Sequence, residues 1–184
     1  MSSNSLRIAP IDIASASPKV RAILDAVKAD IGMVPNLFKT LAQSPTTLDT
    51  YLGVSSTLAS GRLTPAQCEI VALAVGQANH CAYCLSAHSM IAKGAGLNET
   101  AIEAARRGSG EAPKDAALAR FAQLLTTERG VVSDAELSAF KQAGFDDGQA
   151  LEVIAHVALN TLTNYVNHVA GTEIDFPVVD VRIG

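Results

Sequence analysis

The chain has 184 residues, enough for one domain that buries a real core, so we expect residues 1–184 to form a single domain. Hydrophobic residues make up 48% and Ala alone accounts for 31 positions, which predicts a core of small, closely packed side chains. The net charge of −4 without a basic stripe excludes nucleic acid as the main partner. The longest apolar run, 70–76, is far below the ~20 residues of a membrane span.

The cysteines indicate thiol chemistry in a reducing compartment. There are three, an odd number that does not suit a disulfide-stapled secreted scaffold, and the N-terminus lacks the apolar segment of a signal peptide. Cys81 and Cys84 form a C-x-x-C motif, and Cys68 lies apart. We therefore expect a cytoplasmic protein whose C-x-x-C pair is redox-active or metal-binding.

Cap residues, prolines and glycines predict a series of helices and no sustained strand. The expected helices cover residues 18–31, 45–60, 65–78, a segment beginning at 81, 99–107, 113–129, 134–143 and 149–170, with a short apolar stretch before 43. The tail from 173 to 184 is expected to be extended and docked on the helices. The predicted fold class is all-α.

The segment around the C-x-x-C motif brings reactive groups together. At ~100° per residue, Cys81, Cys84 and His88 fall within an arc of about 60° on one helix face. The helix N-terminus favours a thiolate at Cys81, whereas the imidazole four residues from Cys84 favours a thiolate there. Since a nucleophile needs a base, we assign the attack to Cys84.

Glu69 is expected to contact His88. If the helices on either side of Asn79 fold back antiparallel, residues equally far from this turn face each other, and Glu69 and His88 satisfy that condition. A carboxylate beside an imidazole orients the ring and raises its basicity, so the pair can relay a proton for the thiol.

Other interpretations of these residues stay open. The group of Cys81, Cys84, His88 and Glu69, with His80 in reserve, has the donor types of a metal site, but the second Cys/His pair of most structural zinc sites is absent, so we predict no metal. The C-x-x-C pair can also be simple core packing. Cys68 is expected in the core, and Tyr83 is expected either in the core or in a pocket.

The last helix carries a second polar set in helical register. Polar residues in step on an apolar helix need partners when buried, so the set lines a pocket, forms a subunit interface or faces solvent. The set consists of His156, Asn160, Thr163, Asn164 and Asn167. Of these, His156, Asn160 and Asn164 are candidate pocket residues, together with Tyr83 from the C-x-x-C motif.

The pattern E-x11-C-x-Y-C-x3-H, formed by Glu69, Cys81, Tyr83, Cys84 and His88, resembles the alkylhydroperoxidase D (AhpD)-like branch of the carboxymuconolactone decarboxylase superfamily. Its core lies within 64–94. The segments 34–38 and 160–177 are similar to the subgroup of peroxidase-related enzymes.

The resemblance implies an AhpD-like helical fold with the C-x-x-C at the N-terminus of a central helix, in homo-oligomers such as trimers or hexamers. It also implies a thiol peroxidase without metal or other cofactor, in which Cys84 attacks a hydroperoxide, Cys81 resolves the sulfenic acid, and Glu69 and His88 relay protons. A lipoyl-type or thioredoxin-like thiol would be the reductant. Tyr83 departs from the family, since some members have His there.

Two other functions remain as alternatives. A non-redox enzyme of the carboxymuconolactone decarboxylase type would use Glu69 and His88 for proton transfer and leave the cysteines without a purpose. A metal-stabilised binding module would use the cysteines structurally.

Overall fold

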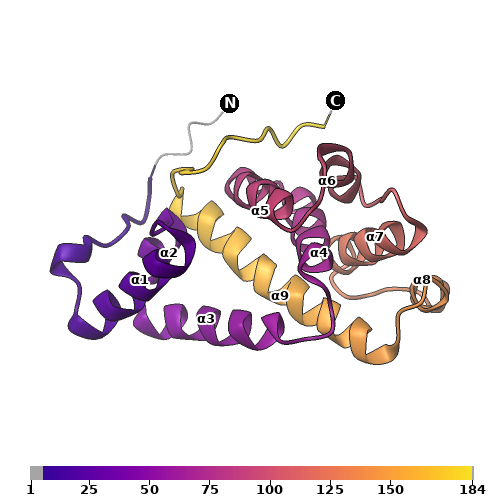
Figure 1. The fold of residues 1–184 in the computed structure, drawn as a ribbon, viewed down its shortest axis with the longest axis horizontal. Coiled ribbons are helices and arrows are strands. Elements are labelled where there is room, and N and C mark those ends of the chain that lie inside the picture. The colour runs from indigo at the N-terminus through magenta and orange to yellow at the C-terminus, as the bar shows by residue number, and fades with distance from the viewer. Residues whose placement is uncertain (1–5, 184) are drawn as a thin grey trace.

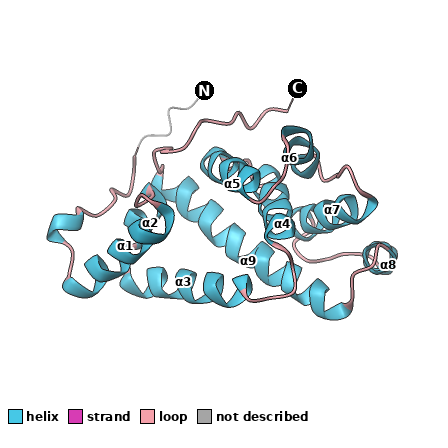
Figure 2. Ribbon diagram, viewed as in Figure 1, coloured by secondary structure: helices cyan, strands magenta, loops and turns pink. Residues whose placement is uncertain are grey.

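The computed structural model describes residues 6–183, and within this range its regular secondary structure is entirely helical, as predicted (Figures 1 and 2). A short 3-10 helix, Ile13–Ser15, precedes the helices α1 (Pro18–Ile31), α2 (Asn36–Leu41), α3 (Pro45–Ala59), α4 (Pro65–Ala78), α5 (Ala82–Gly94), α6 (Glu99–Arg106), α7 (Pro113–Thr127), α8 (Asp134–Gln142) and α9 (Asp147–Ala170).

Local capping chemistry explains where most of these helices begin. The side chains of Thr64, Ser133 and Asp146 each accept a hydrogen bond from the backbone three residues later, in reciprocal capping boxes. The predicted end of α7 was wrong: the helix stops at Thr127, two residues before Arg129. Arg129 already has a left-handed φ of 55°, so the turn begins one residue before the glycine that was expected to produce it.

Helix α4 lies at the centre of the fold. It packs against α5, α6, α7 and α9, and every residue from Ile70 to Gly76 is buried. A helix surrounded by other helices is apolar on all sides, which explains the uninterrupted apolar run in the sequence.

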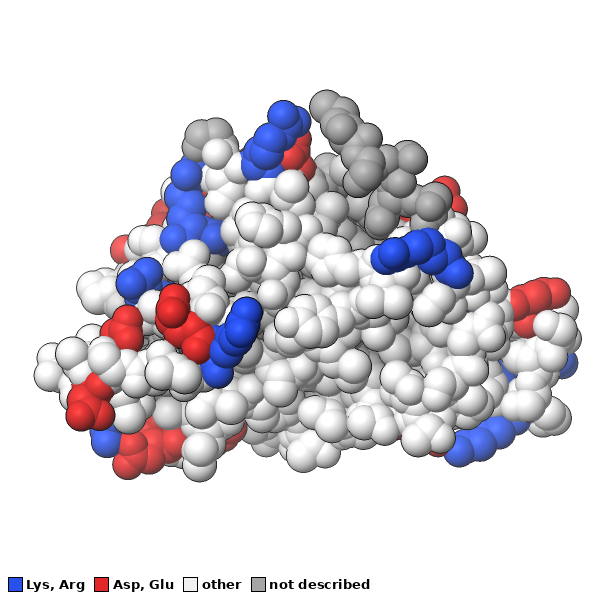
Figure 3. Space-filling model, turned by 180° about the vertical axis from the view of Figure 1, so that it is seen from behind, with Lys and Arg blue, Asp and Glu red and all other residues white. Residues whose placement is uncertain are grey.

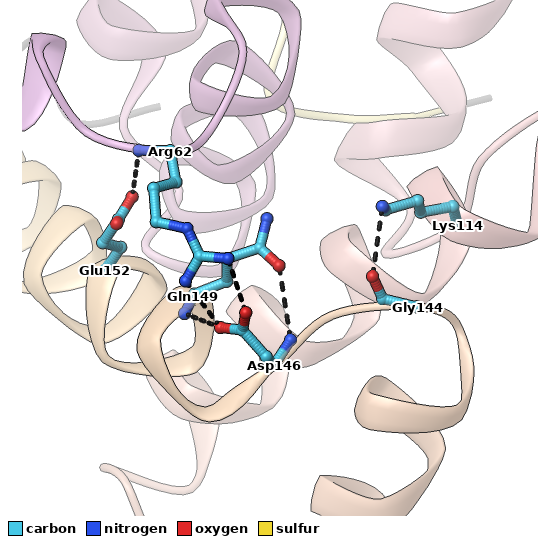
Figure 4. A network of polar contacts seen from close by, with 6 residues as sticks. All are labelled: Arg62, Lys114, Gly144, Asp146, Gln149 and Glu152. Carbon is cyan, nitrogen blue, oxygen red and sulfur yellow. Dashed lines mark hydrogen bonds and ion pairs between the residues drawn. The ribbon is translucent and has the colours of Figure 1, made fainter.

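Helices α4 and α9 lie side by side and run in the same direction (Figure 1). At their C-terminal ends, the Asn79 amide donates to Asn164 Oδ1 over 2.9 Å, and His168 Nε2 lies 3.0 Å from the Asn79 carbonyl oxygen. At their N-terminal ends, the Arg62 guanidinium binds both carboxylate oxygens of Asp146, and Arg62 N donates to Glu152 Oε2 over 2.7 Å (Figure 4). Corresponding ends of the two helices are therefore fixed together.

The C-terminal segment is extended and docked, as predicted, as far as the description reaches; Gly184 lies outside the described residues. Val179 N donates to Ser86 Oγ over 3.0 Å, the Gln77 amide donates to the Val181 carbonyl over 2.7 Å, and Arg106 donates to the Asp180 carbonyl over 2.6 Å. These contacts hold the segment on α4, α5 and α6.

Within residues 6–183, no helix combines the length and the apolar character that a membrane span requires.

Candidate active site

The two cysteines of the C-x-x-C motif lie at the start of α5. Cys81 is the N-cap residue, and its sulfur accepts a hydrogen bond from Cys84 N. The two sulfurs are 2.7 Å apart, and both thiols are free. His80, with a φ of 54°, makes the tight turn that brings the chain from α4 into α5.

A cavity of about 290 Å³ opens beside Cys84. Its wall includes Cys84, Glu69 and His88, but not Cys81, which is only 1% exposed. Of the two cysteines of the motif, Cys84 is therefore the one that a molecule in the cavity can reach, and Cys81 lies behind it.

Glu69 and His88 are in direct contact. His88 Nδ1 lies 2.8 Å from Glu69 Oε2, which confirms the register predicted for the α4–α5 hairpin. Burial opposes the charged imidazole, but the charge and the hydrogen bond of Glu69 outweigh it and raise the pKa of His88. Among the described residues, no direct hydrogen bond joins His88 to either thiol of the motif, and both His88 and Cys84 line the cavity.

The surroundings shift the pKa values of the two thiols in opposite directions. The hydrogen bond from the Cys81 thiol lowers the pKa of Cys84, burial opposes this, and the charge of His88 and the amides of Asn167 and Asn164 lower it further. The Asn167 amide donates to the Cys84 sulfur over 3.3 Å. The hydrogen bond to Cys84, together with burial, raises the pKa of Cys81. The negative charge of the pair thus belongs to Cys84.

Tyr83 lies in the cavity wall and also joins three segments of the chain. Its hydroxyl accepts a hydrogen bond from Leu37 N over 3.1 Å and donates one to Asp175 Oδ1 over 2.8 Å. Its ring packs edge-on against Phe176. The residue between the two cysteines thus holds α2 and the C-terminal segment beside the motif.

The five polar residues of α9 are all buried, so solvent exposure was the wrong interpretation. His156, Asn160 and Thr163 line the cavity, whereas Asn164 and Asn167 lie beside Asn79 and Cys84. Sequence reasoning grouped Asn167 with this set but did not select it as a site residue. Its position three residues after Asn164, on the same face of the helix, is the pattern that could have identified it.

Cys68 packs against the core, as expected, but it is only half-buried and also lies in the cavity wall. Its sulfur is 3.7 Å from His156 Nε2. Position 68 falls on the α4 face that carries Glu69 and Ala72 into the cavity, so it shares their surroundings. Tyr51 on α3, which sequence reasoning did not consider, also lines the cavity.

The metal-site interpretation needs at least three His, Cys, Asp or Glu side chains arranged around one point. Residues 6–183 contain no such group.

Comparison with known proteins agrees with this architecture. Residues 45–127 match the carboxymuconolactone decarboxylase family. This segment therefore matches a carboxymuconolactone decarboxylase family domain, as the sequence resemblance predicted. No curated protein matches the chain.

Solved structures of the same fold cover nearly the whole chain. An uncharacterized peroxidase-related protein of Ralstonia eutropha JMP134, described as an alkylhydroperoxidase AhpD core, has a TM-score of 0.82 and 24% identity, over 93% of this chain and 94% of that one. The debrominase Bmp8 in complex with 2,3,4-tribromopyrrole has a TM-score of 0.79 and 18% identity, over 95% and 94%. A peroxidase-related protein of Silicibacter sp. TM1040 has a TM-score of 0.78 and 20% identity, over 91% and 92%. These likenesses establish the AhpD-like fold.

The carboxymuconolactone decarboxylase domain supplies only part of the site. Residues 45–127 span α3 to α7 and contain Glu69, Cys81, Cys84 and His88. The amides beside Cys84 and the imidazole beside Cys68 come from α9, outside the matched segment. Both regions are needed to enclose the cavity.

Proposed function

We propose that the protein is a thiol peroxidase that reduces hydroperoxides through a dithiol–disulfide cycle of Cys84 and Cys81. The observation that carries this proposal is the asymmetric thiol pair: two free sulfurs 2.7 Å apart, of which only Cys84 lines a cavity that also holds the Glu69–His88 pair. The low pKa of Cys84 supplies the thiolate that attack on a peroxide needs.

The first half of the cycle oxidises Cys84. Its thiolate attacks one oxygen of the hydroperoxide, so a sulfur–oxygen bond forms while the oxygen–oxygen bond breaks. Sulfur gives two electrons to the peroxide and becomes a sulfenic acid. The leaving alkoxide takes a proton and departs as the alcohol. His88, whose pKa Glu69 raises, is the proton donor facing the same cavity.

The second half restores the thiols. Cys81 attacks the sulfenic sulfur of Cys84, closing a disulfide and releasing water. A dithiol reductant, lipoyl-type or thioredoxin-like, then returns two electrons and two protons and leaves oxidised. This cycle requires a reducing compartment, which agrees with a cytoplasmic location.

Peroxide consumption measured together with the number of free thiols tests the proposal. With a dithiol reductant present, we expect catalytic loss of hydroperoxide; without it, one equivalent of hydroperoxide should remove two thiols per chain. Hydroperoxide consumption without loss of thiols, or no consumption, would contradict the proposal.

Substitution of each cysteine assigns the roles. Cys84→Ser should abolish turnover, whereas Cys81→Ser should still be oxidised once and accumulate a sulfenic acid on Cys84 that a sulfenate-specific probe labels. Labelling of Cys81 in the Cys84→Ser variant would reverse the assignment.

The same assay separates the other reactions found with this fold. The debrominase Bmp8 was crystallised with 2,3,4-tribromopyrrole, so that compound serves as a second substrate in the panel. A non-redox reaction of the decarboxylase type would leave the thiol count constant and survive Cys84→Ser. Turnover of the bromopyrrole in place of hydroperoxides would favour a debrominase. Activity that persists in Cys84→Ser at a constant thiol count would favour the decarboxylase-type enzyme.

A further inference from the structure

The cavity has two chemically different ends. A Cβ placed on Gly76 would lie 3.7 Å from the Cβ of Cys84, so Cys84 lies at the C-terminal end of α4. Cys68 lies eight residues before Gly76 on α4, about 12 Å along the helix axis. Both cysteines line the cavity, which therefore extends along α4.

The neighbouring helices agree with this direction. Helix α5 runs antiparallel to α4 and places His88, four residues after Cys84, beside Glu69, the residue that follows Cys68. Helix α9 runs parallel to α4, and it contributes His156 beside Cys68 and Asn167 beside Cys84. Cys84 and Cys68 thus lie at opposite ends, and the Glu69–His88 contact lies near the level of Cys68 on α4.

Apart from Glu69, the end distant from Cys84 is mostly apolar, with one further polar pair. The apolar residues there are Ala59, Leu63, Pro65, Ile91, Ala95 and Leu159. The polar pair is Cys68 and His156, whose sulfur and Nε2 lie 3.7 Å apart. His156 is 7% exposed, and this sulfur is its one side-chain hydrogen-bond partner among the described residues. Among the described residues, its other ring nitrogen has no hydrogen-bond partner.

Both members of this pair are uncharged near neutral pH. Burial lowers the pKa of His156, and burial together with the charges of Glu69 and Glu152 raises the pKa of Cys68 to about 11. Glu152 is held beside this end by Arg62 N (Figure 4). A neutral imidazole suits a hydroxyl or carbonyl group, whereas a carboxylate would face two glutamates.

We propose that His156 is a specificity-determining residue that binds an uncharged polar group at the far end of an elongated organic hydroperoxide, while the peroxide group reacts at Cys84. The proposal rests on the proposed peroxidase function and adds the class of substrate to it. The apolar middle of the molecule would lie along the apolar wall, and its terminal hydroxyl or carbonyl would hydrogen-bond to the imidazole.

Rates of Cys84 oxidation by matched hydroperoxides test this. ω-Hydroxyoctyl hydroperoxide should react about three- to tenfold faster than n-octyl hydroperoxide, the gain expected from one neutral hydrogen bond. The ω-carboxyoctyl compound should react more slowly than either. His156→Leu should remove the preference for the hydroxyl compound, and His156→Gln, which keeps a hydrogen-bonding group, should retain part of it.

His168→Leu is the matched control, since it makes the same change on the same helix outside the cavity wall. It should leave the ratio of the two rates as in the unaltered chain. Equal rates for the hydroxyl and alkyl compounds in the unaltered chain, or a preference that persists in His156→Leu, would overturn the proposal.

A binding measurement separates this proposal from the peroxidase function. In the reduced protein, octanediol should shift the ring resonances of His156 in NMR spectra more than n-octanol does. If octanediol does so although no hydroperoxide is reduced, the binding site stands and the peroxidase proposal fails. If hydroperoxides are reduced at equal rates and the diol shifts nothing, the peroxidase stands and this inference fails.

Discussion

At the Cys84 sulfur, hydrogen-bond donors compensate for burial. An apolar environment raises the pKa of a thiol because it disfavours the charged form. Cys84 avoids this outcome because the Cys81 thiol and the Asn167 amide both donate to its sulfur. Cys81 must keep its proton to donate this hydrogen bond. The same hydrogen bond therefore lowers the pKa of Cys84 and raises the pKa of Cys81.

Replacing Asn167 with Leu tests the contribution of α9 to the thiolate. The substitution removes the amide donor, so the pKa of Cys84 should rise towards that of an ordinary thiol. Oxidation by hydrogen peroxide should slow at neutral pH and approach the original rate as the pH rises through the new pKa. The thiolate ultraviolet absorbance, followed against pH, reports the shift directly.

Cys84→Ser is the control for this titration. The lowest thiolate step should vanish in that variant, because burial still raises the pKa values of Cys68 and Cys81 when Cys84 is absent. An unchanged midpoint in Asn167→Leu would show that the amide does not stabilise the thiolate.

The Glu69–His88 pair predicts non-additive kinetics. General acid–base catalysis typically contributes ~10²–10⁴-fold, so Glu69→Gln should slow Cys84 oxidation by roughly tenfold or more, and His88→Ala at least as much. Because the carboxylate acts through the imidazole, the double variant should be little slower than His88→Ala alone. Second-order rates of oxidation for the four proteins decide this, and strictly additive losses would show that the two residues act independently.

The sequence predicted the residues of the site where the constraint is local. Helical periodicity placed Cys81, Cys84 and His88 on one face, and the symmetry of a hairpin placed Glu69 beside His88. The position of Cys68 in the cavity wall and the contact of Asn167 with Cys84 depend on how α9 packs against α4, more than eighty residues away. No local pattern encodes that contact.

At the level of single helices, capping residues carried most of the predictive information. A cap is a hydrogen bond between residues three apart, so it can be recognised without the rest of the fold. The end of α7 was missed because Arg129, with no special preference for a left-handed φ, makes the turn before Gly130.

Thr64 provides a test of this capping chemistry beside the site. Its hydroxyl accepts from Gln67 N over 3.2 Å, and the Gln67 side chain accepts from Thr64 N over 3.0 Å. Thr64→Ala should lower the free energy of unfolding by about 0.5–2 kcal/mol, measured by urea denaturation. Ser133→Ala, at the equivalent cap of α8, should cost a similar amount, so a loss confined to Ser133→Ala would contradict the role of Thr64.

At the scale of the whole molecule, the arrangement of the helices was predictable only through resemblance. Apolar periodicity predicted an all-α chain, and the buried run in α4 indicated a central position. The parallel pairing of α4 with α9 is fixed by Arg62 with Asp146 at one end and by Asn79 with Asn164 at the other. Each contact joins residues more than eighty positions apart, and both connect the two helices that contribute to the cavity wall.

The outer face of α9 predicts self-association. Four large apolar side chains, exposed by 45–68%, fall within an arc of about 60° along the helix: Leu151, Ile154, Tyr165 and Val169. Seen from behind, the molecule also has a broad uncharged area, with charged side chains gathered at its margins (Figure 3). A helix with apolar residues on its outer as well as its inner face is typical of burial on both sides, so we predict a homo-oligomer, with a trimer or hexamer favoured by the family resemblance.

Light scattering at micromolar concentration, with one charge added to that face, tests this prediction. Val169→Lys should shift the protein towards the 19.1 kDa monomer, because an unpaired ammonium group would be buried in the interface. Val178→Lys is the matched control, since Val178 is 75% exposed in the C-terminal segment and lies outside α9. The particle mass of Val178→Lys should equal that of the unaltered chain. A 19.1 kDa particle for the unaltered chain would contradict self-association altogether, and equal dissociation in both variants would show that the interface does not lie on α9.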